Sequence, residues 1–98
     1  MAIKKQFLKS KPVCKVTFTV PAEEAKKVAV VGSFNEWNTE ATPLKKLKNG
    51  SFKATVDLES GVSHEFRYLV DGEYQNEIQA DAFAWNDYAA AENSILSL

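Results

Sequence analysis

Apolar and polar residues alternate along several short runs of this chain, and that period of two restricts the fold more than any other feature. In residues 13–20 the even-numbered positions are Cys, Val, Phe and Val, and Lys or Thr separates them. Successive side chains of a β-strand point to opposite faces, so this pattern predicts a strand with one buried face. We expect Pro21 to end it, because proline cannot donate a hydrogen bond to a neighbouring strand.

Turn signals separate the other runs: Asn-Gly at 49–50, Ser-Gly at 60–61 and Asp-Gly at 71–72. These turns mark the ends of predicted strands at residues 27–31, 52–58, 64–70, 73–75 and 94–98. Residues 76–92 are expected to be mostly irregular, and the helix-favouring segments are no longer than a turn. The pattern predicts an all-β fold, a two-sheet antiparallel sandwich of about seven strands. We expect residues 12–98 to form this single module and residues 1–11 to form a basic N-terminal arm.

Composition narrows the possible functions. Twelve Lys and Arg against thirteen Asp and Glu give a net charge of −1, so the molecule as a whole does not attract nucleic acid or an anionic membrane. The single cysteine, Cys14, cannot form an internal disulfide, and the single histidine, His64, leaves a zinc site short of ligands. We therefore expect no metal and no cofactor. A free thiol without an apolar export segment indicates a cytoplasmic protein.

The Asp-Gly pair at 71–72 predicts a two-residue hairpin turn of type I′. Such a turn places Leu69 opposite Tyr74, and it puts Arg67, Leu69, Tyr74 and Asn76 on one face of the sheet. An exposed aromatic ring beside hydrogen-bonding groups suits a sugar, whose C–H face covers the ring while its hydroxyls meet the rim. The alternative is that Leu69 and Tyr74 form only a stabilising cross-strand pair.

A second aromatic residue, Trp37, lies in the loop that follows the predicted strand at 27–31. Phe34 of the same loop is expected to pack into the core, whereas Trp37 has only polar neighbours in the sequence. An exposed tryptophan is more often a binding anchor than a surplus residue. The alternative is that Trp37 closes the open end of the sandwich.

Residues 31–37 (VGSFNEW) and 66–72 (FRYLVDG), in this order and spacing, resemble carbohydrate-binding module family 48. This is the starch- and glycogen-binding early set domain at the front of isoamylases and glycogen branching enzymes, and it also occurs in the β subunit of AMP-activated protein kinase. The resemblance extends from about Val13 to Leu98 and is greatest to short bacterial proteins made of this module alone. It implies an immunoglobulin-like sandwich that binds α-1,4-glucan without catalysis.

The resemblance also implies the site residues. Trp37 would be the first ring, Arg67 the basic residue and Tyr74 the second ring, where the family usually has Trp. Tyr88 would lie at a loop tip, and Asn93 would be the amide near the last strand. Trp85 is an extra aromatic residue that would either join this platform or cover the core.

A catalytic function is not expected. Asp71 belongs to the turn, and the other carboxylates of this region, Glu73, Glu77 and Asp81, fall on a segment predicted to be exposed, without the apolar wall that raises a catalytic pKa. Cys14 and His64 have the parity of core residues, so we interpret both as structural. The binding partner would be an α-glucan, with a glycogen- or starch-active enzyme as a further partner.

Two other functions remain open. The module could have lost its sugar site and serve protein interaction, docking to an amylolytic enzyme or to itself. The lysines that precede Glu23 could bind phosphates of nucleic acid. We interpret them instead as charges that keep an edge strand soluble, because no Arg or aromatic residue is interleaved among them.

Overall fold

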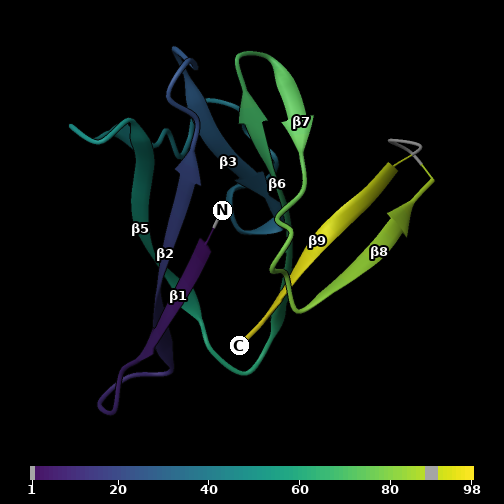
Figure 1. The fold of residues 1–98 in the computed structure, drawn as a ribbon. Coiled ribbons are helices and arrows are strands. Elements are labelled where there is room, and N and C mark those ends of the chain that lie inside the picture. The colour runs from purple at the N-terminus through teal and green to yellow at the C-terminus, as the bar shows by residue number, and fades with distance from the viewer. Residues whose placement is uncertain (1, 88–90) are drawn as a thin grey trace.

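In the computed structural model, which describes residues 2–87 and 91–98, two antiparallel sheets face each other (Figure 1). Sheet 1 has the order β1-β2-β5-β4 and contains β1 (Ala2–Phe7), β2 (Val13–Pro21), β5 (Ser51–Glu59) and β4 (Lys45–Lys46). Sheet 2 has the order β3-β6-β9-β8 and contains β3 (Val28–Gly32), β6 (Ser63–Val70), β9 (Ala91–Ser97) and β8 (Ala82–Asn86). A further strand, β7 (Glu73–Gln75), pairs with β6. The predicted all-β, immunoglobulin-like sandwich is confirmed.

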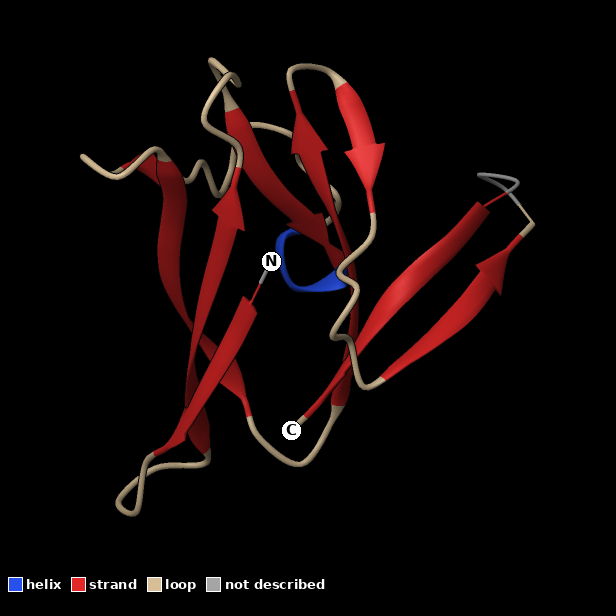
Figure 2. Ribbon diagram, in the orientation of Figure 1, coloured by secondary structure: helices blue, strands red, loops and turns tan. Residues whose placement is uncertain are grey.

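Helical structure in the described residues is limited to one 3₁₀ turn, η1 (Ser33–Asn35), which follows β3 (Figure 2). The described part of the chain contains no helix long and apolar enough to span a membrane.

The core lies between the sheets and is centred on Phe18 of β2. Its ring centroid lies 5.3 Å from that of Phe66 and 6.1 Å from that of Tyr68, both on β6, in edge-to-face contacts. Phe34 of η1 stacks on the same ring at 6.1 Å, as the sequence predicted for this residue. Cys14 is fully buried in this cluster. Aromatic pairs of this kind add about 0.5–1.5 kcal/mol each to the burial of their apolar area.

Three strands were not predicted, one of which is the two-residue β4. Residues 2–7, inside the segment expected to be an arm, form β1 and pair with β2 along their whole length. Residues 82–86, inside the stretch expected to be irregular, form β8, which pairs with β9. Alanine and asparagine are poor strand formers, so the alternation of Phe83 and Trp85 with them gave little signal. Sheet pairing overrides that local preference.

The outer edge of β3 is covered by residues 42–44. Val30 N donates to Thr42 O at 3.0 Å, and Leu44 N donates to Val28 O at 2.8 Å. A strand that is bonded along both edges and buried on both faces is continuously apolar, which explains the sequence of Val28–Gly32. The chain is therefore held firmly just before the loop that carries Trp37.

Candidate functional site

The hairpin turn after β6 has the geometry predicted from the Asp-Gly pair. Asp71 has φ 47° and Gly72 has φ 87°, as a type I′ turn requires. The register is also as predicted, with Leu69 opposite Tyr74. The Asp71 carboxylate accepts hydrogen bonds from the backbone N–H groups of Lys26 and Lys27, at 3.0 and 2.8 Å. The turn is thereby fixed to the chain that leads into β3.

Arg67 and Tyr74 lie together on the outer face of sheet 2, the face turned away from the core. The guanidinium carbon of Arg67 lies 4.5 Å from the centroid of the Tyr74 ring, a cation–π contact. Tyr74 remains 47% exposed. The contact orients the ring while leaving much of it available to a ligand. Asn76 does not join this group, because its amide donates to Glu92 O at 2.8 Å.

Asn93 of β9 is on the same outer face, since Ser94 pairs with the inward-facing Phe66 and neighbouring residues alternate. It is only 1% exposed, and its Nδ2 donates to Glu65 Oε1 at 3.3 Å. Its Oδ1 has no hydrogen-bond partner among the described residues, and neither does the buried Nε of Arg67. Buried polar groups are usually paired, so an unpaired donor and an unpaired acceptor on one face need an explanation.

Trp37 is half-buried and lies outside the core cluster. Its backbone N–H donates to Gly32 O at 2.9 Å, and both Glu36 and Trp37 have φ 57°. Positive φ is unusual for a bulky residue and costs about 1–3 kcal/mol, which the surrounding structure must supply.

Asn35 supplies that support. Its Oδ1 accepts from Gly32 N at 3.0 Å, and its Nδ2 donates to Val30 O at 3.1 Å and to Thr42 Oγ1 at 3.0 Å. The loop also needs glycine at position 32, because an added Cβ would collide with the Glu65 carbonyl oxygen. The GSFN part of the motif therefore holds the Trp37 backbone in one conformation.

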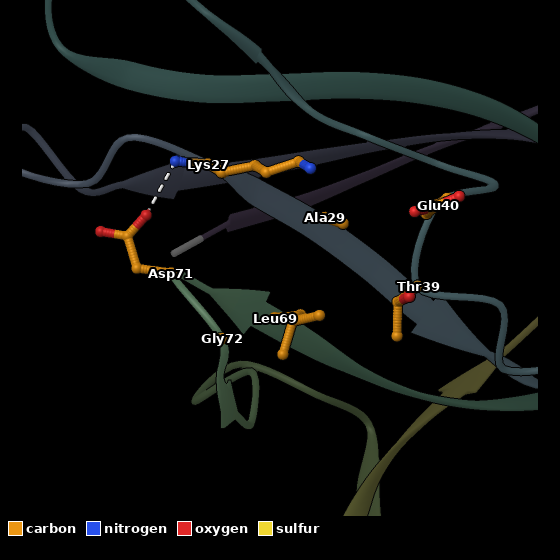
Figure 3. A pocket seen from close by; sticks show the side chains of 7 residues that line it. All are labelled: Lys27, Ala29, Thr39, Glu40, Leu69, Asp71 and Gly72. Atoms are coloured by element: carbon orange, nitrogen blue, oxygen red, sulfur yellow. Dashed lines mark hydrogen bonds between the residues drawn. The ribbon is translucent and has the colours of Figure 1, made fainter.

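A pocket of about 260 Å³ opens between the loop that carries Trp37 and the turn that precedes Tyr74 (Figure 3). Its lining residues come from three segments: Lys27, Ala29, Thr39, Glu40, Leu69, Asp71 and Gly72. Leu69 is also the cross-strand partner of Tyr74. The loop and the hairpin thus border the same face of sheet 2, beside the Arg67–Tyr74 pair.

The prediction that Glu77 lies on an exposed segment is wrong. Glu77 is fully buried, and its Oε1 accepts a hydrogen bond of 2.8 Å from the Tyr68 hydroxyl. Its Oε2 accepts from Gln79 N at 3.1 Å, and its N–H donates to Ser94 Oγ at 2.9 Å. Burial, together with the adjacent carboxylate, raises the pKa of Tyr68 well above its ordinary value. This network lies on the core side of sheet 2, where it joins the segment after β7 to β9.

Trp85 joins neither the Arg67–Tyr74 pair nor the core. Ala84 pairs with Asn93, so Phe83 and Trp85 point to the opposite side of sheet 2 from Asn93. β8 is the edge strand of sheet 2 and lies away from sheet 1 (Figure 1), and the two rings are 46% and 62% exposed. The Trp85 indole N–H donates to Asp87 Oδ1 at 2.6 Å.

Tyr88, the predicted contact at a loop tip, lies outside the described residues. His64 is half-buried, with Nε2 3.2 Å from Glu59 O and its ring edge-to-face with Phe34. No group of three His, Cys, Asp or Glu side chains among residues 2–87 and 91–98 is arranged to hold a metal ion.

The family model described as carbohydrate-binding module 48 (isoamylase N-terminal domain) matches residues 8–84 of the 98. The match includes the loop with Trp37, the β6–β7 hairpin and the pocket between them.

Proposed function

Because the chain belongs to carbohydrate-binding module family 48, we propose that it binds α-1,4-glucan, such as glycogen, starch or maltodextrin, on the outer face of sheet 2. In this proposal Tyr74 and Trp37 provide rings on which glucosyl residues stack, and Arg67 and Asn93 hydrogen-bond to hydroxyl groups. Tyr88 remains a proposed contact from the resemblance alone. The module acts by binding and not by catalysis.

The observation that carries the proposal is the Arg67–Tyr74 pair beside two unpaired buried polar atoms. Among the residues that the structure describes, Arg67 Nε–H is a donor without an acceptor, and Asn93 Oδ1 is an acceptor without a donor. A hydroxyl group is both donor and acceptor, so a sugar can satisfy both residues once the side chains shift to expose these buried atoms. The half-exposed Tyr74 ring next to them offers an apolar surface for the C–H face of a pyranose.

The strained backbone at Trp37 adds support. A loop that holds two consecutive residues at positive φ contains strain, and such strain is common at ligand-binding positions. The Asn35 side chain accepts one hydrogen bond and donates two, which hold the backbone of the Trp37 loop in this conformation before any ligand arrives. Preorganisation of this kind lowers the entropic cost of binding.

Isothermal titration with maltoheptaose and, in parallel, with cellohexaose tests the proposal. We expect binding of the α-linked sugar, weaker or no binding of the β-linked sugar, and loss of binding in Arg67→Met and Trp37→Ala. Tyr74→Phe, which keeps the ring, is the matched control and should bind. No binding of maltoheptaose by the folded protein would contradict the proposal.

One observation favours protein interaction as a second candidate function. Phe83 and Trp85 are exposed on β8, which is an edge strand with no charged residue of its own. Edge strands without charges are prone to pair with another chain. A partner recovered by the wild type but not by Trp85→Ala, and unaffected by added maltodextrin, would support this function.

A further inference from the structure

The free edge of β8 differs from the other free strand edges of the molecule. Among residues 2–87 and 91–98, β8 pairs with β9 on one side and has no strand on its other side. The edge strands β1 and β4 carry two lysines each and β7 carries a glutamate, whereas β8 (AFAWN) has no charged residue. Charged side chains normally keep an edge strand from pairing with another chain. β8 lacks that protection, and it lies at the outside of the sandwich (Figure 1).

Two aromatic rings project from β8 on the core side of sheet 2. Phe83 pairs with Ser94, which is also the partner of the inward-facing Phe66, so Phe83 and Trp85 lie on the core side. Sheet 1 does not cover these rings, since they remain 46% and 62% exposed. The two rings and the uncharged strand therefore form one apolar surface, the β8 edge, which a single copy of the chain leaves open.

The sequence of β8 is complementary to itself about Ala84. Two antiparallel copies related by a two-fold axis at Ala84 place Phe83 of each copy opposite Trp85 of the other, on one face of the sheet. Aromatic residues that face each other in this way stabilise an antiparallel pair. An axis at residue 83 would instead place Trp85 opposite Asp81, and an axis at residue 85 would place Phe83 opposite Asp87. The axis at Ala84 is therefore the one that pairs both rings.

The aspartates that flank β8 are compatible with this register. Asp81 of one copy would face Asp87 of the other, at the two ends of the strand pair. Asp81 Oδ2 accepts a hydrogen bond of 2.7 Å from Lys5 Nζ, whose charge offsets its own. Asp87 Oδ1 accepts the Trp85 indole N–H at 2.6 Å. Each carboxylate thus has a partner within its own chain, and added salt should strengthen the contact by screening the remaining repulsion.

The area of the β8 edge places the contact among weak interfaces. An aromatic side chain offers about 150–250 Å² of surface, so the exposed fractions of Phe83 and Trp85 leave on the order of 200 Å² per copy. Even with the five-residue strands added, the total stays below the roughly 1,200 Å² at which standard stable interfaces begin. We therefore expect a reversible dimer with a dissociation constant on the order of 100 μM.

We propose that β8 pairs antiparallel with β8 of a second copy of this chain, about a two-fold axis at Ala84. This inference rests on the second candidate function, protein interaction, and names its partner; it does not depend on glucan binding. The pairing joins the two copies of sheet 2 into one sheet. Both outer faces then lie on the same side of that sheet, so a branched glucan bound by one copy can also engage the other.

Sedimentation equilibrium from about 10 μM to about 1 mM protein tests the pairing. The average mass of the wild type should rise from that of a monomer toward that of a dimer, with or without saturating maltoheptaose. Trp85→Ala should raise the dissociation constant about tenfold or more. Ala84→Lys should stay monomeric, because it places two like charges at the two-fold axis. Gln6→Lys adds the same charge to another edge strand, β1, and is the matched control that should still dimerise.

Cysteine cross-linking tests the register in case Ala84→Lys does not fold. In Ala84→Cys the two thiols face each other across the axis, within reach of a disulfide after a small movement, and a covalent dimer should form in a glutathione redox buffer. In Ala82→Cys the two thiols lie more than about 12 Å apart along the strands and should not cross-link. The native thiol, Cys14, is fully buried and does not compete.

Three results would overturn self-pairing: a wild type that stays monomeric at the highest concentration, a dimer that maltoheptaose dissociates, or equal cross-linking of Ala82→Cys and Ala84→Cys. A monomeric wild type that retains a different protein through Trp85 would also overturn it, while keeping protein interaction as a function. Binding of maltoheptaose is measured separately by titration, so a failure of the dimer and a failure of glucan binding are distinguishable.

Discussion

The guanidinium carbon of Arg67 lies 4.5 Å from the centre of the Tyr74 ring, although the two residues are on different strands of a hairpin. The type I′ turn at Asp71 and Gly72 produces this contact, because it sets a register in which Tyr74 faces Leu69, two residues after Arg67. A register shift of one residue would send Tyr74 to the other face of the sheet. The candidate site thus depends directly on the turn.

The contribution of Tyr74 to glucan binding should depend mainly on the area of the ring on which a sugar can stack. Tyr74→Ala is expected to weaken maltoheptaose binding by tenfold or more, which corresponds to about 1.4 kcal/mol. Tyr74→Trp should strengthen it, since an indole offers a larger stacking surface. Both variants should unfold at nearly the wild-type urea concentration, because the side chain is half-exposed. Equal affinities for the Ala and Trp variants would contradict this role.

Trp85 should not contribute to binding on the outer face of sheet 2. Its side chain projects from the opposite side of the sheet, so Trp85→Ala should leave the maltoheptaose affinity unchanged in isothermal titration. Trp37→Ala is the informative comparison, since these are the two tryptophans of the chain. A loss of affinity in Trp85→Ala as large as that in Trp37→Ala would show that the sugar lies elsewhere.

The buried Tyr68–Glu77 hydrogen bond should stabilise the fold at neutral pH. Tyr68→Phe leaves Glu77 Oε1 without its 2.8 Å donor, and we expect a loss of about 1–3 kcal/mol in the free energy of unfolding. Urea denaturation at pH 7 measures this loss. Val30→Ala is a useful reference, because it removes core volume without touching the hydrogen bond.

The raised pKa of Tyr68 predicts that the free energy of unfolding decreases at alkaline pH. The folded-state pKa of Tyr68 is raised above its unfolded value of about 10, so the stabilisation is fully present below that pH. It should decrease as the pH rises above 10, because the unfolded chain ionises Tyr68 while the folded chain keeps it neutral. Tyr68→Phe should show a shallower decrease. Parallel pH profiles for the two proteins would count against this assignment.

Lys5 should control the ionisation of Asp81. Lys5 Nζ donates to Asp81 Oδ2 at 2.7 Å, and Ser97 N donates to the same oxygen at 2.8 Å. These bonds lower the pKa of Asp81, with the Lys5 bond the larger cause. The resulting stabilisation is present above the ordinary aspartate pKa of about 3.9 and is lost as the pH falls through the lowered value. Lys5→Met should raise the Asp81 pKa in a carboxyl NMR titration.

Lys4→Met is the control for this measurement. Neighbouring residues of β1 point to opposite faces, so Lys4 is directed away from Asp81. An equal rise of the Asp81 pKa in both variants would mean that the general loss of positive charge, and not the Lys5 contact, is the cause.

The hairpin part of the candidate site could be predicted from the sequence because its geometry is local. An Asp-Gly pair specifies the turn, the turn specifies the register, and the register specifies which side chains share a face with Tyr74. The burial of Glu77 could not be predicted in this way. Its partners, Tyr68 and Ser94, are nine and seventeen residues away in the sequence, and the contacts form only when β6 and β9 pair. A glutamate in a polar segment gives no local sign of such partners.

The strands β1 and β8 were missed for a related reason. The lysines of β1 and the alanines of β8 are weak strand formers, and each segment becomes a strand by pairing with one partner, β2 or β9. The position of Trp85 followed from the pairing of β8, so its face could not be assigned before that strand was known. The pocket likewise depends on three segments that are distant in the sequence.

Backbone amide NMR during titration with maltoheptaose tests the central claim most directly. If the outer face of sheet 2 binds the glucan, the largest shift changes should fall on Arg67, Leu69, Tyr74 and Asn93, with further changes in the loop that carries Trp37. Cellohexaose should produce much smaller changes at the same residues. Changes confined to Phe83 and Trp85, or no changes with maltoheptaose at all, would contradict the assignment of this face as the glucan-binding site.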